Sequence, residues 1–147
     1  MKTTFSYPKW AEIPNIDLYL DQVLLYVNQV CDPISPDKDK GLTASMVNNY
    51  VKHGYLTKPD KKKYQRQQIA RLIAITTLKS VFSIQEIAQT LNTLQSQASS
   101  DQLYDAFVDY MNQGIDPANP IIQSSCQTVK LYHQTLALIH HTQEEEI

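Results

Sequence analysis

The chain has 147 residues, of which 42% are hydrophobic and 19% are charged, a length typical of one domain with a hydrophobic core. Three glycines and seven prolines exclude a collagen-like chain, and no apolar run reaches the length of about 18 residues that a membrane-spanning helix needs. Residues 1–15 lack the pattern of a secretory signal. Cys31 and Cys126 form no CxxC or Cys–His spacing, so we expect a reduced, cytoplasmic protein.

The formal charge of −2 is unevenly distributed along the chain. Residues 38–79 hold ten of the thirteen Lys and Arg residues and only two acids, so this segment carries +8 and the remainder −10. Such a concentration is typical of a segment that binds a polyanion. A solvated lysine-rich face has the same pattern, so charge alone leaves both interpretations open.

The first of six predicted helices follows Pro14, with Asn15 as its N-cap, and stops by Pro33, because proline breaks the helix. Its apolar face is predicted to contain Ile16, Leu20, Val23, Leu24, Val27 and Val30. Residues 32–41, with two prolines and several charges, are predicted to form a loop.

The second helix begins after Thr43, whose hydroxyl can cap it, and ends at Gly54, a residue that suits a left-handed C-cap. A turn centred on Pro59-Asp60 follows, so residues 55–64 are predicted as a tight two-stranded excursion with a basic tip. The buried stripe of this second helix is predicted to be Met46, Val47, Tyr50 and Val51.

The third helix covers about residues 65–80, and the fourth begins at a capping box formed by Ser83 and Glu86. A polar linker over residues 95–100 leads to a fifth helix over residues 101–113, which ends at Gly114. The core positions of the third and fourth helices are Ile69, Leu72, Ile73, Thr76, Leu78, Ile84, Ile87, Leu91 and Leu94.

The sixth helix starts at Asn119-Pro120, a cap followed by proline at the first helical position. Its apolar residues lie close to a heptad seam, while Leu131 and Leu138 lie off it. Two apolar sides predict a helix that packs inside one protomer and against a second one. The dimerisation residues expected from the seam are Ile122, Val129, Tyr132, Leu136 and Ile139.

Four motifs follow one another in an order that resembles the MerR-type winged helix-turn-helix transcriptional regulators. They are Met-Val-Asn-Asn-Tyr-Val-Lys-His-Gly-Tyr-Leu (residues 46–56), Lys-Lys-Tyr (62–64), Ile-Ala-Arg-Leu-Ile-Ala-Ile (69–75) and Phe-Ser-Ile-Gln-Glu-Ile (82–87). The resemblance covers about residues 42–94. Asn48 and Asn49 stand where that family has arginine and an aromatic residue, and Lys62 replaces the wing arginine.

The opening Pro-Lys-Trp-Ala-Glu-Ile-Pro (residues 8–14) is also similar to an uncharacterised bacterial family of unknown function. Together, the helices and the MerR resemblance imply an all-α fold, with a small β wing. Residues 1–95 would form the winged helix-turn-helix region with an N-terminal helix. Residues 96–147 would form a C-terminal helical pair on the same core.

The MerR resemblance implies a homodimer that binds double-stranded DNA and regulates transcription, with no effector identified. Short polar side chains on a helix can read base edges in the major groove, and lysines beside it can contact phosphates. The candidate DNA-binding residues are Thr43, Ser45, Asn48, Asn49, Lys52, Lys61, Lys62, Lys63, Tyr64 and Arg66.

Two alternatives stay open: a protein-interaction module on the same scaffold and, more distantly, a small helical enzyme. The enzyme would use Asp101, Asp105 and Asp109, which share one helix face and more often form a solvated face. The C-terminal residues His133, His140, His141, Glu144 and Glu145 have spacings that a zinc site uses. No complete catalytic or metal-binding pattern is present, so we expect no enzyme activity, no metal and no cofactor.

Overall fold

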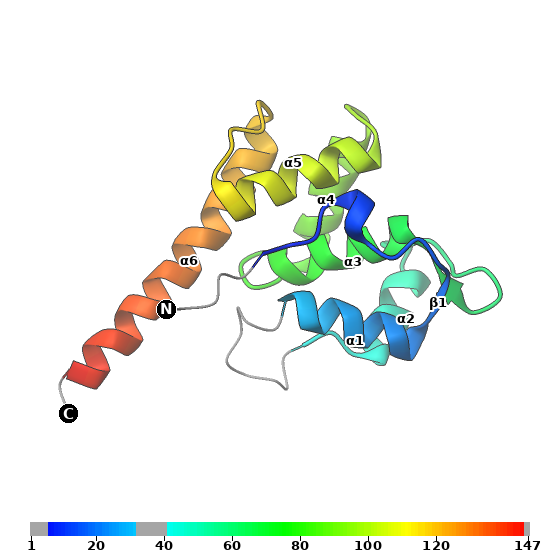
Figure 1. The fold of residues 1–147 in the computed structure, drawn as a ribbon, viewed down its shortest axis with the longest axis horizontal. Helices are drawn as coiled ribbons and strands as arrows, with labels where there is room; N and C mark the ends of the chain where they lie inside the picture. Colours follow the sequence, from blue (N-terminus) through cyan, green and yellow to red (C-terminus); the bar gives the residue numbers. More distant parts are fainter. Residues whose placement is uncertain (1–5, 32–40, 146–147) are drawn as a thin grey trace.

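The computed structural model describes residues 6–31 and 41–145, and within them six α-helices and one small antiparallel sheet (Figure 1). The prediction of a mostly helical chain with a small β element is therefore confirmed. No helix in this described part is long and apolar enough to cross a membrane. The elements are the 3-10 helix η1 (Trp10–Glu12), β1 (Leu18–Tyr19), α1 (Leu20–Cys31), α2 (Ala44–Lys52), β2 (Lys63–Tyr64), α3 (Arg66–Leu78), α4 (Ile84–Gln95), α5 (Ser100–Gln113) and α6 (Pro120–Glu145).

Helix α3 is the centre of the fold, and α1, α4, α5 and α6 all contact it (Figure 1). Its apolar side chains point to more than one side, because Ile69, Leu72, Ile73 and Ile75 are all buried. A helix that is apolar around most of its circumference is stable only when neighbours surround it. One hydrophobic core therefore extends from Tyr7 to Val129. It contains residues of both the N-terminal region (residues 1–95) and the C-terminal helical pair (residues 96–147).

Side-chain caps form at three of the four predicted helix starts, and the exception is Asn15, because the first helix begins only at Leu20. Thr43 Oγ1 accepts a hydrogen bond from Met46 N at 3.2 Å, and Ser83 and Glu86 form the reciprocal capping box. Asn119 Oδ1 accepts from the first amides of α6, and Gly114 ends α5 with φ of 71°. These caps depend only on residues within one turn of the helix, which is why the sequence predicts them well.

The strand pairing differs from the prediction. Within residues 55–64 one isolated antiparallel bridge forms, between Asp60 and Lys63, so the turn is centred on Lys61-Lys62 and not on Pro59-Asp60. The strand β2 pairs instead with β1, with Leu18 opposite Tyr64 and Tyr19 opposite Lys63. The first helix consequently begins at Leu20, and Ile16, expected on its buried face, is 66% exposed. Burial alternates between Leu18 and Tyr19, as it does in a strand. The predicted loop over residues 32–41 lies, up to residue 40, outside the described residues.

Helix α6 has two parts with different surroundings. Its proximal part (residues 120–130) packs on α5 and α3, so that Ile122, Cys126 and Val129 are buried within the protomer. Ile122 and Val129 were expected in a dimer seam, and that prediction is wrong for these two residues because the core of the same chain covers them. At 26 residues α6 is much longer than α5, which has 14, and no other described helix lies beside its far end (Figure 1).

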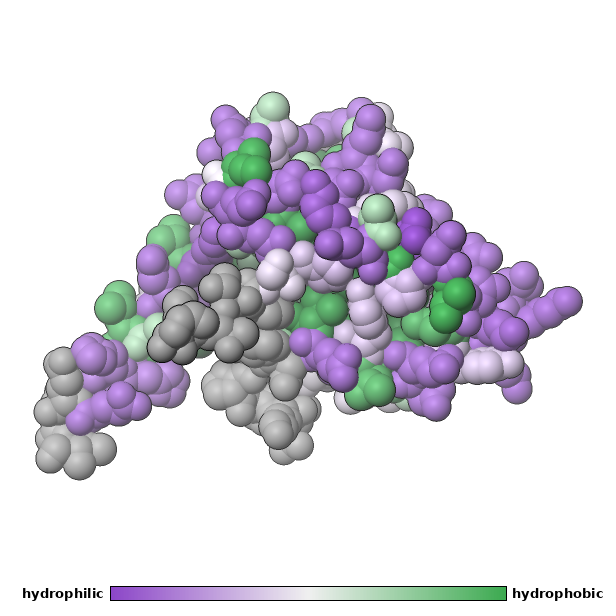
Figure 2. All heavy atoms as spheres, in the orientation of Figure 1, coloured by the Kyte–Doolittle hydropathy of each residue, from purple (hydrophilic) through white to green (hydrophobic). Residues whose placement is uncertain are grey.

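The distal part of α6 (residues 131–145) projects from the rest of the fold (Figure 1), and Figure 2 shows hydrophobic atoms along it. Leu131 is 52% exposed and Leu138 is 64% exposed, while Tyr132 and Ile139 are a little less than half exposed. Large apolar side chains are therefore left uncovered on this part of the helix within the described chain.

Candidate nucleic-acid interface

The outer face of α2 presents four polar side chains. Because Val47 and Tyr50 point into the core, the opposite side of the helix faces solvent. His53, at the C-cap, hydrogen-bonds through Nδ1 to Asn49 O at 2.9 Å and stacks on Tyr55. The exposed residues of the outer face are Ser45, Asn48, Asn49 and Lys52, with Thr43 exposed at its start.

Side chains from other elements hold both ends of α2 in place. Asn28 on α1 brackets Leu42, accepting from its N–H at 2.8 Å and donating to its carbonyl at 2.9 Å. A Cβ at Gly41 would lie only 2.8 Å from Asn28 Oδ1, so glycine permits this close approach. After the helix, Arg71 Nε donates to Tyr55 O at 2.7 Å. The orientation of α2 is thus set by α1 and α3.

A basic turn (residues 58–63) follows α2. Asp60 and Lys63 exchange two backbone hydrogen bonds, of 3.1 and 2.9 Å, which close the turn. Lys61 and Lys62 at its tip have positive φ values of 51° and 68°, which is typical of a type I′ turn and unfavourable for side chains other than Gly, Asn or Asp. The buried side chain of Gln68 donates to Thr57 O and Lys58 O and so anchors the base of the turn.

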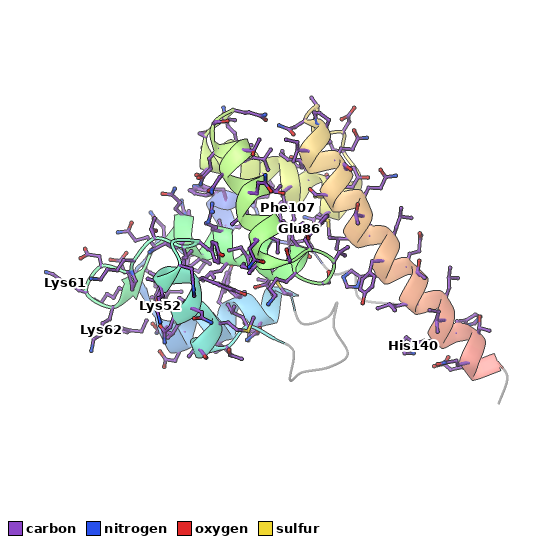
Figure 3. The ribbon with its side chains drawn as sticks, turned by 180° about the vertical axis from the view of Figure 1, so that it is seen from behind. Lys52, Lys61, Lys62, Glu86, Phe107 and His140 are labelled. Carbon is purple, nitrogen blue, oxygen red and sulfur yellow. The ribbon has the colours of Figure 1, made fainter. Side chains whose placement is uncertain are left out.

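The outer face of α2 and the basic turn lie at the same end of the molecule. Figure 3 shows Lys52 on α2 near Lys61 and Lys62 on the turn, with His140 of α6 at the opposite end. We call these two elements together the basic surface. Over residues 41–79 the chain has eight basic residues and one acid, Asp60. Among the described residues, none of these eight lies within 4.0 Å of a carboxylate oxygen.

Three of the predicted contact residues are anchored to the protein itself. Tyr64 is 3% exposed, because the register of β2 turns its ring into the core, and it drops out of the candidate set. Lys63 lies half-buried with its Nζ 5.3 Å from the centre of the Tyr19 ring, and Arg66 Nε donates to Ile13 O at 3.2 Å. Lys61 and Lys62 remain fully available to a ligand.

The sequence interpretation missed the residues that position this surface: Asn28, Gln68 and Arg71. Each uses a side chain to hold backbone of a distant segment. Only Gln68 has a signal in the sequence. It lies one helical turn before Leu72, at a core position of α3 where an apolar residue is expected. Lys58, exposed beside the tip of the turn, was also left out of the candidate list.

The acidic stripe of α5 has partners within the protein. Asp105 Oδ1 accepts from Trp10 N at 2.8 Å, Asp109 pairs with Lys9 Nζ at 3.2 Å, and Asp101 accepts from Ser99 Oγ. This hydrogen bond from Ser99 is the main cause that lowers the pKa of Asp101. The stripe thus fastens the N-terminal segment to α5, assisted by Tyr104, whose hydroxyl donates to Pro8 O at 2.7 Å.

The remaining candidate groups do not assemble into a site in the described residues. No group of three or more His, Cys, Asp or Glu residues is placed there to hold a metal ion. Burial lowers the pKa of His133 and raises the pKa of both Cys31 and Cys126 to about 12. Both cysteines are buried thiols that hold their protons at neutral pH, so neither is a ready nucleophile.

Comparison with known proteins identifies a family that the chain matches. No curated protein and no solved structure matches the chain. A family model described as a domain of unknown function (DUF1836) matches residues 8–107, from the Pro-Lys-Trp opening through most of α5. The match includes the basic surface and its positioning residues and stops before α6. Because it spans more than half of the sequence, the chain belongs to the DUF1836 family.

Proposed function

We propose that this protein binds double-stranded DNA through the basic surface and acts as a dimeric transcriptional regulator. The observation that carries the proposal is that Lys52 on α2 and Lys58, Lys61 and Lys62 on the basic turn are exposed, lie at one end of the molecule and have no carboxylate partner among the described residues. A surface of unpaired cations attracts the phosphate backbone and releases its counterions on binding.

The outer face of α2 would recognise the base sequence of the DNA. A helix fits the major groove of B-DNA, where asparagine can pair with adenine through two hydrogen bonds. Asn48 and Asn49 are both exposed on this face, and Ser45 lies one turn before Asn49. Lys61 and Lys62 on the neighbouring turn would contact phosphates and position the helix without reading bases.

A second copy of the chain would dimerise through the distal part of α6. Tyr132, Leu136 and Ile139 remain from the predicted seam, and Leu131 and Leu138 add a seven-residue spacing suited to helix pairing. Because this part of α6 and the basic surface lie at opposite ends of the molecule, a symmetric pair would carry two separated basic surfaces (Figure 3). Such a dimer would recognise a pseudo-palindromic site.

Fluorescence anisotropy of a labelled mixed-sequence duplex tests the DNA-binding proposal. The matched variants are Lys61→Ala/Lys62→Ala on the basic turn and Lys79→Ala/Lys130→Ala elsewhere, which remove the same number of charges. Binding should weaken steeply between about 50 and 200 mM salt. The turn variant should flatten the log–log salt slope by about two units, since each lost phosphate contact changes it by about 0.9. The control pair should change the slope far less.

Two results would contradict the proposal. One is the absence of binding at the lower salt concentration, which would favour the protein-interaction module. The other is an equal change of slope in both double variants, which would mean that net charge and not the basic surface binds DNA.

Analytical ultracentrifugation tests the dimer separately. The wild-type protein should sediment as a dimer at micromolar concentration, and Leu138→Lys should sediment as a monomer. Ala137→Lys, which adds the same charge at an exposed position on the other side of α6 from the apolar surface of its distal part, is the control. A wild-type monomer would refute the dimer and leave the DNA-binding proposal standing.

A further inference from the structure

A cavity of about 80 Å³ lies between α3, α4, α5 and α6, and no residue of α2 lines it. Space of about 10–15 Å³ suffices for one water molecule, so this cavity is large enough for a few water molecules or part of a small ligand. The cavity exists because α3 presents Ala70 and Ala74, one turn apart, where larger side chains would fill it. Its walls are mainly apolar and include Leu94 and Phe107.

One charged side chain, Arg71, lines this apolar cavity. Its guanidinium has five N–H donors, of which Nε bonds Tyr55 O at 2.7 Å and Nη2 contacts Asn92 Oδ1 at 3.4 Å. No carboxylate pairs with it among the described residues. Burial lowers the pKa of Arg71, but arginine keeps its charge in proteins. A partly buried cation with unused donors beside an apolar space lacks an anionic partner.

We infer that this cavity binds a small carboxylate with an apolar body. The carboxylate pairs with the free N–H groups of Arg71, and the apolar body occupies the space beside Ala70 and Ala74. Arginine is suited to this role because its planar donors match both oxygens of a carboxylate. The cavity is about half the size of one that encloses benzene, so it covers only part of an aromatic ring or acyl chain and the remainder of the ligand extends out of it. This site does not depend on the proposed DNA binding.

Trp10 provides a direct signal, because it lines the cavity and is the only tryptophan in the chain. The experiment titrates the full-length protein with phenylacetate and octanoate while tryptophan emission is recorded. Phenylacetamide and octanamide are the matched probes, since each keeps the apolar body and removes the charge. At least one acid should give a saturable change and bind about 10- to 100-fold more tightly than its amide.

The variants Arg71→Gln and Arg66→Gln form a matched pair, because both arginines lie on α3 and both donate from Nε to a backbone carbonyl. Only Arg71 lines the cavity, so Arg71→Gln should weaken acid binding about 10- to 100-fold and Arg66→Gln should leave it unchanged. Ala74→Leu fills the cavity and should abolish binding. It also keeps the test decisive if Arg71→Gln fails to fold.

Three results would overturn the inference. The first is no saturable change with either acid up to about 10 mM, which corresponds to an affinity too weak to be specific. The second is equal affinity for an acid and its amide, which would show that Arg71 does not pair with the carboxylate. The third is unchanged acid binding in Ala74→Leu, which would place the ligand outside this cavity.

Discussion

The acidic stripe of α5 and the basic surface are both charge-rich in the sequence, but among the described residues only the acidic stripe has a partner of opposite charge. Asp105 and Asp109 bond to Trp10 N and Lys9 Nζ and fasten the N-terminal segment. Lys52, Lys61 and Lys62 have no carboxylate within ion-pair distance in the part of the chain that the structure describes. The same kind of charge cluster is therefore structural in one region and available to a ligand in the other. A charge cluster indicates a binding surface only when its partners within the fold are missing.

The largest effect on stability should come from the acidic side of this comparison. Asp105→Ala leaves the half-buried amide of Trp10 without its acceptor, and a hydrogen bond to a charged group contributes about 1.5–3 kcal/mol. We expect a decrease of that size in the free energy of unfolding in urea. Asp105→Asn keeps an acceptor oxygen and should lose less. Equal losses for the two variants would mean that the bond to Trp10 is not what Asp105 contributes.

On the basic side, Asn48 and Lys61 should have different effects on DNA binding. After site selection has provided a preferred sequence, Asn48→Ala should reduce discrimination against a changed base pair by about 1–3 kcal/mol and leave the salt slope unchanged. Lys61→Ala should flatten the slope by about 0.9 and leave discrimination unchanged. Competition binding with matched and mismatched duplexes measures both. A change of salt slope in the Asn48 variant would mean that α2 contacts only phosphates.

Replacing the two lysines at the tip of the basic turn should increase the stability of the protein and weaken its DNA binding. Lys61→Asn/Lys62→Gly places residues that favour positive φ at both central positions and should stabilise the protein by about 1 kcal/mol. The same variant removes two unpaired charges and should weaken DNA binding. Thermal unfolding and anisotropy measured on one preparation test both effects. If the variant is less stable than the wild type, the lysines are not strained in this turn.

The smallest effect should come from the ion pair between Lys9 and Asp109. Both side chains are partly solvent-exposed, and the Asp109 carboxylate raises the pKa of Lys9. Exposed ion pairs are screened by water and salt and add little to stability. Lys9→Ala should therefore leave the urea unfolding midpoint unchanged. A clear decrease in the midpoint would show that this ion pair stabilises the N-terminal segment more than an exposed pair is expected to.

The sequence predicts local features of this fold and fails where distant segments meet. The caps at Thr43, Ser83 and Asn119 depend on neighbouring residues, and all three form as expected. The pairing of β1 with β2 joins segments on either side of two helices, so the periodicity of residues 55–64 does not reveal it. Hydrophobic spacing on α6 identifies the apolar residues but not which element covers Ile122 and Val129.

The candidate site follows the same rule. The outer face of α2 is predictable because Val47 and Tyr50 mark the buried side and leave the other side exposed. The burial of Tyr64 follows from its strand register, and the availability of Lys61 follows from a turn closed by backbone bonds. Neither the burial of Tyr64 nor the exposure of Lys61 has a local signal in the sequence. Both residues were therefore predicted to contact DNA.

The most direct test of the central claim is the map of backbone amide shifts in a ¹⁵N NMR titration with a mixed-sequence duplex. The account predicts the largest shifts on the outer face of α2 and on the basic turn, with the amides of the acidic stripe on α5 little changed. Shifts concentrated on α5 or on the proximal part of α6, or no shifts at about 50 mM salt, would contradict it.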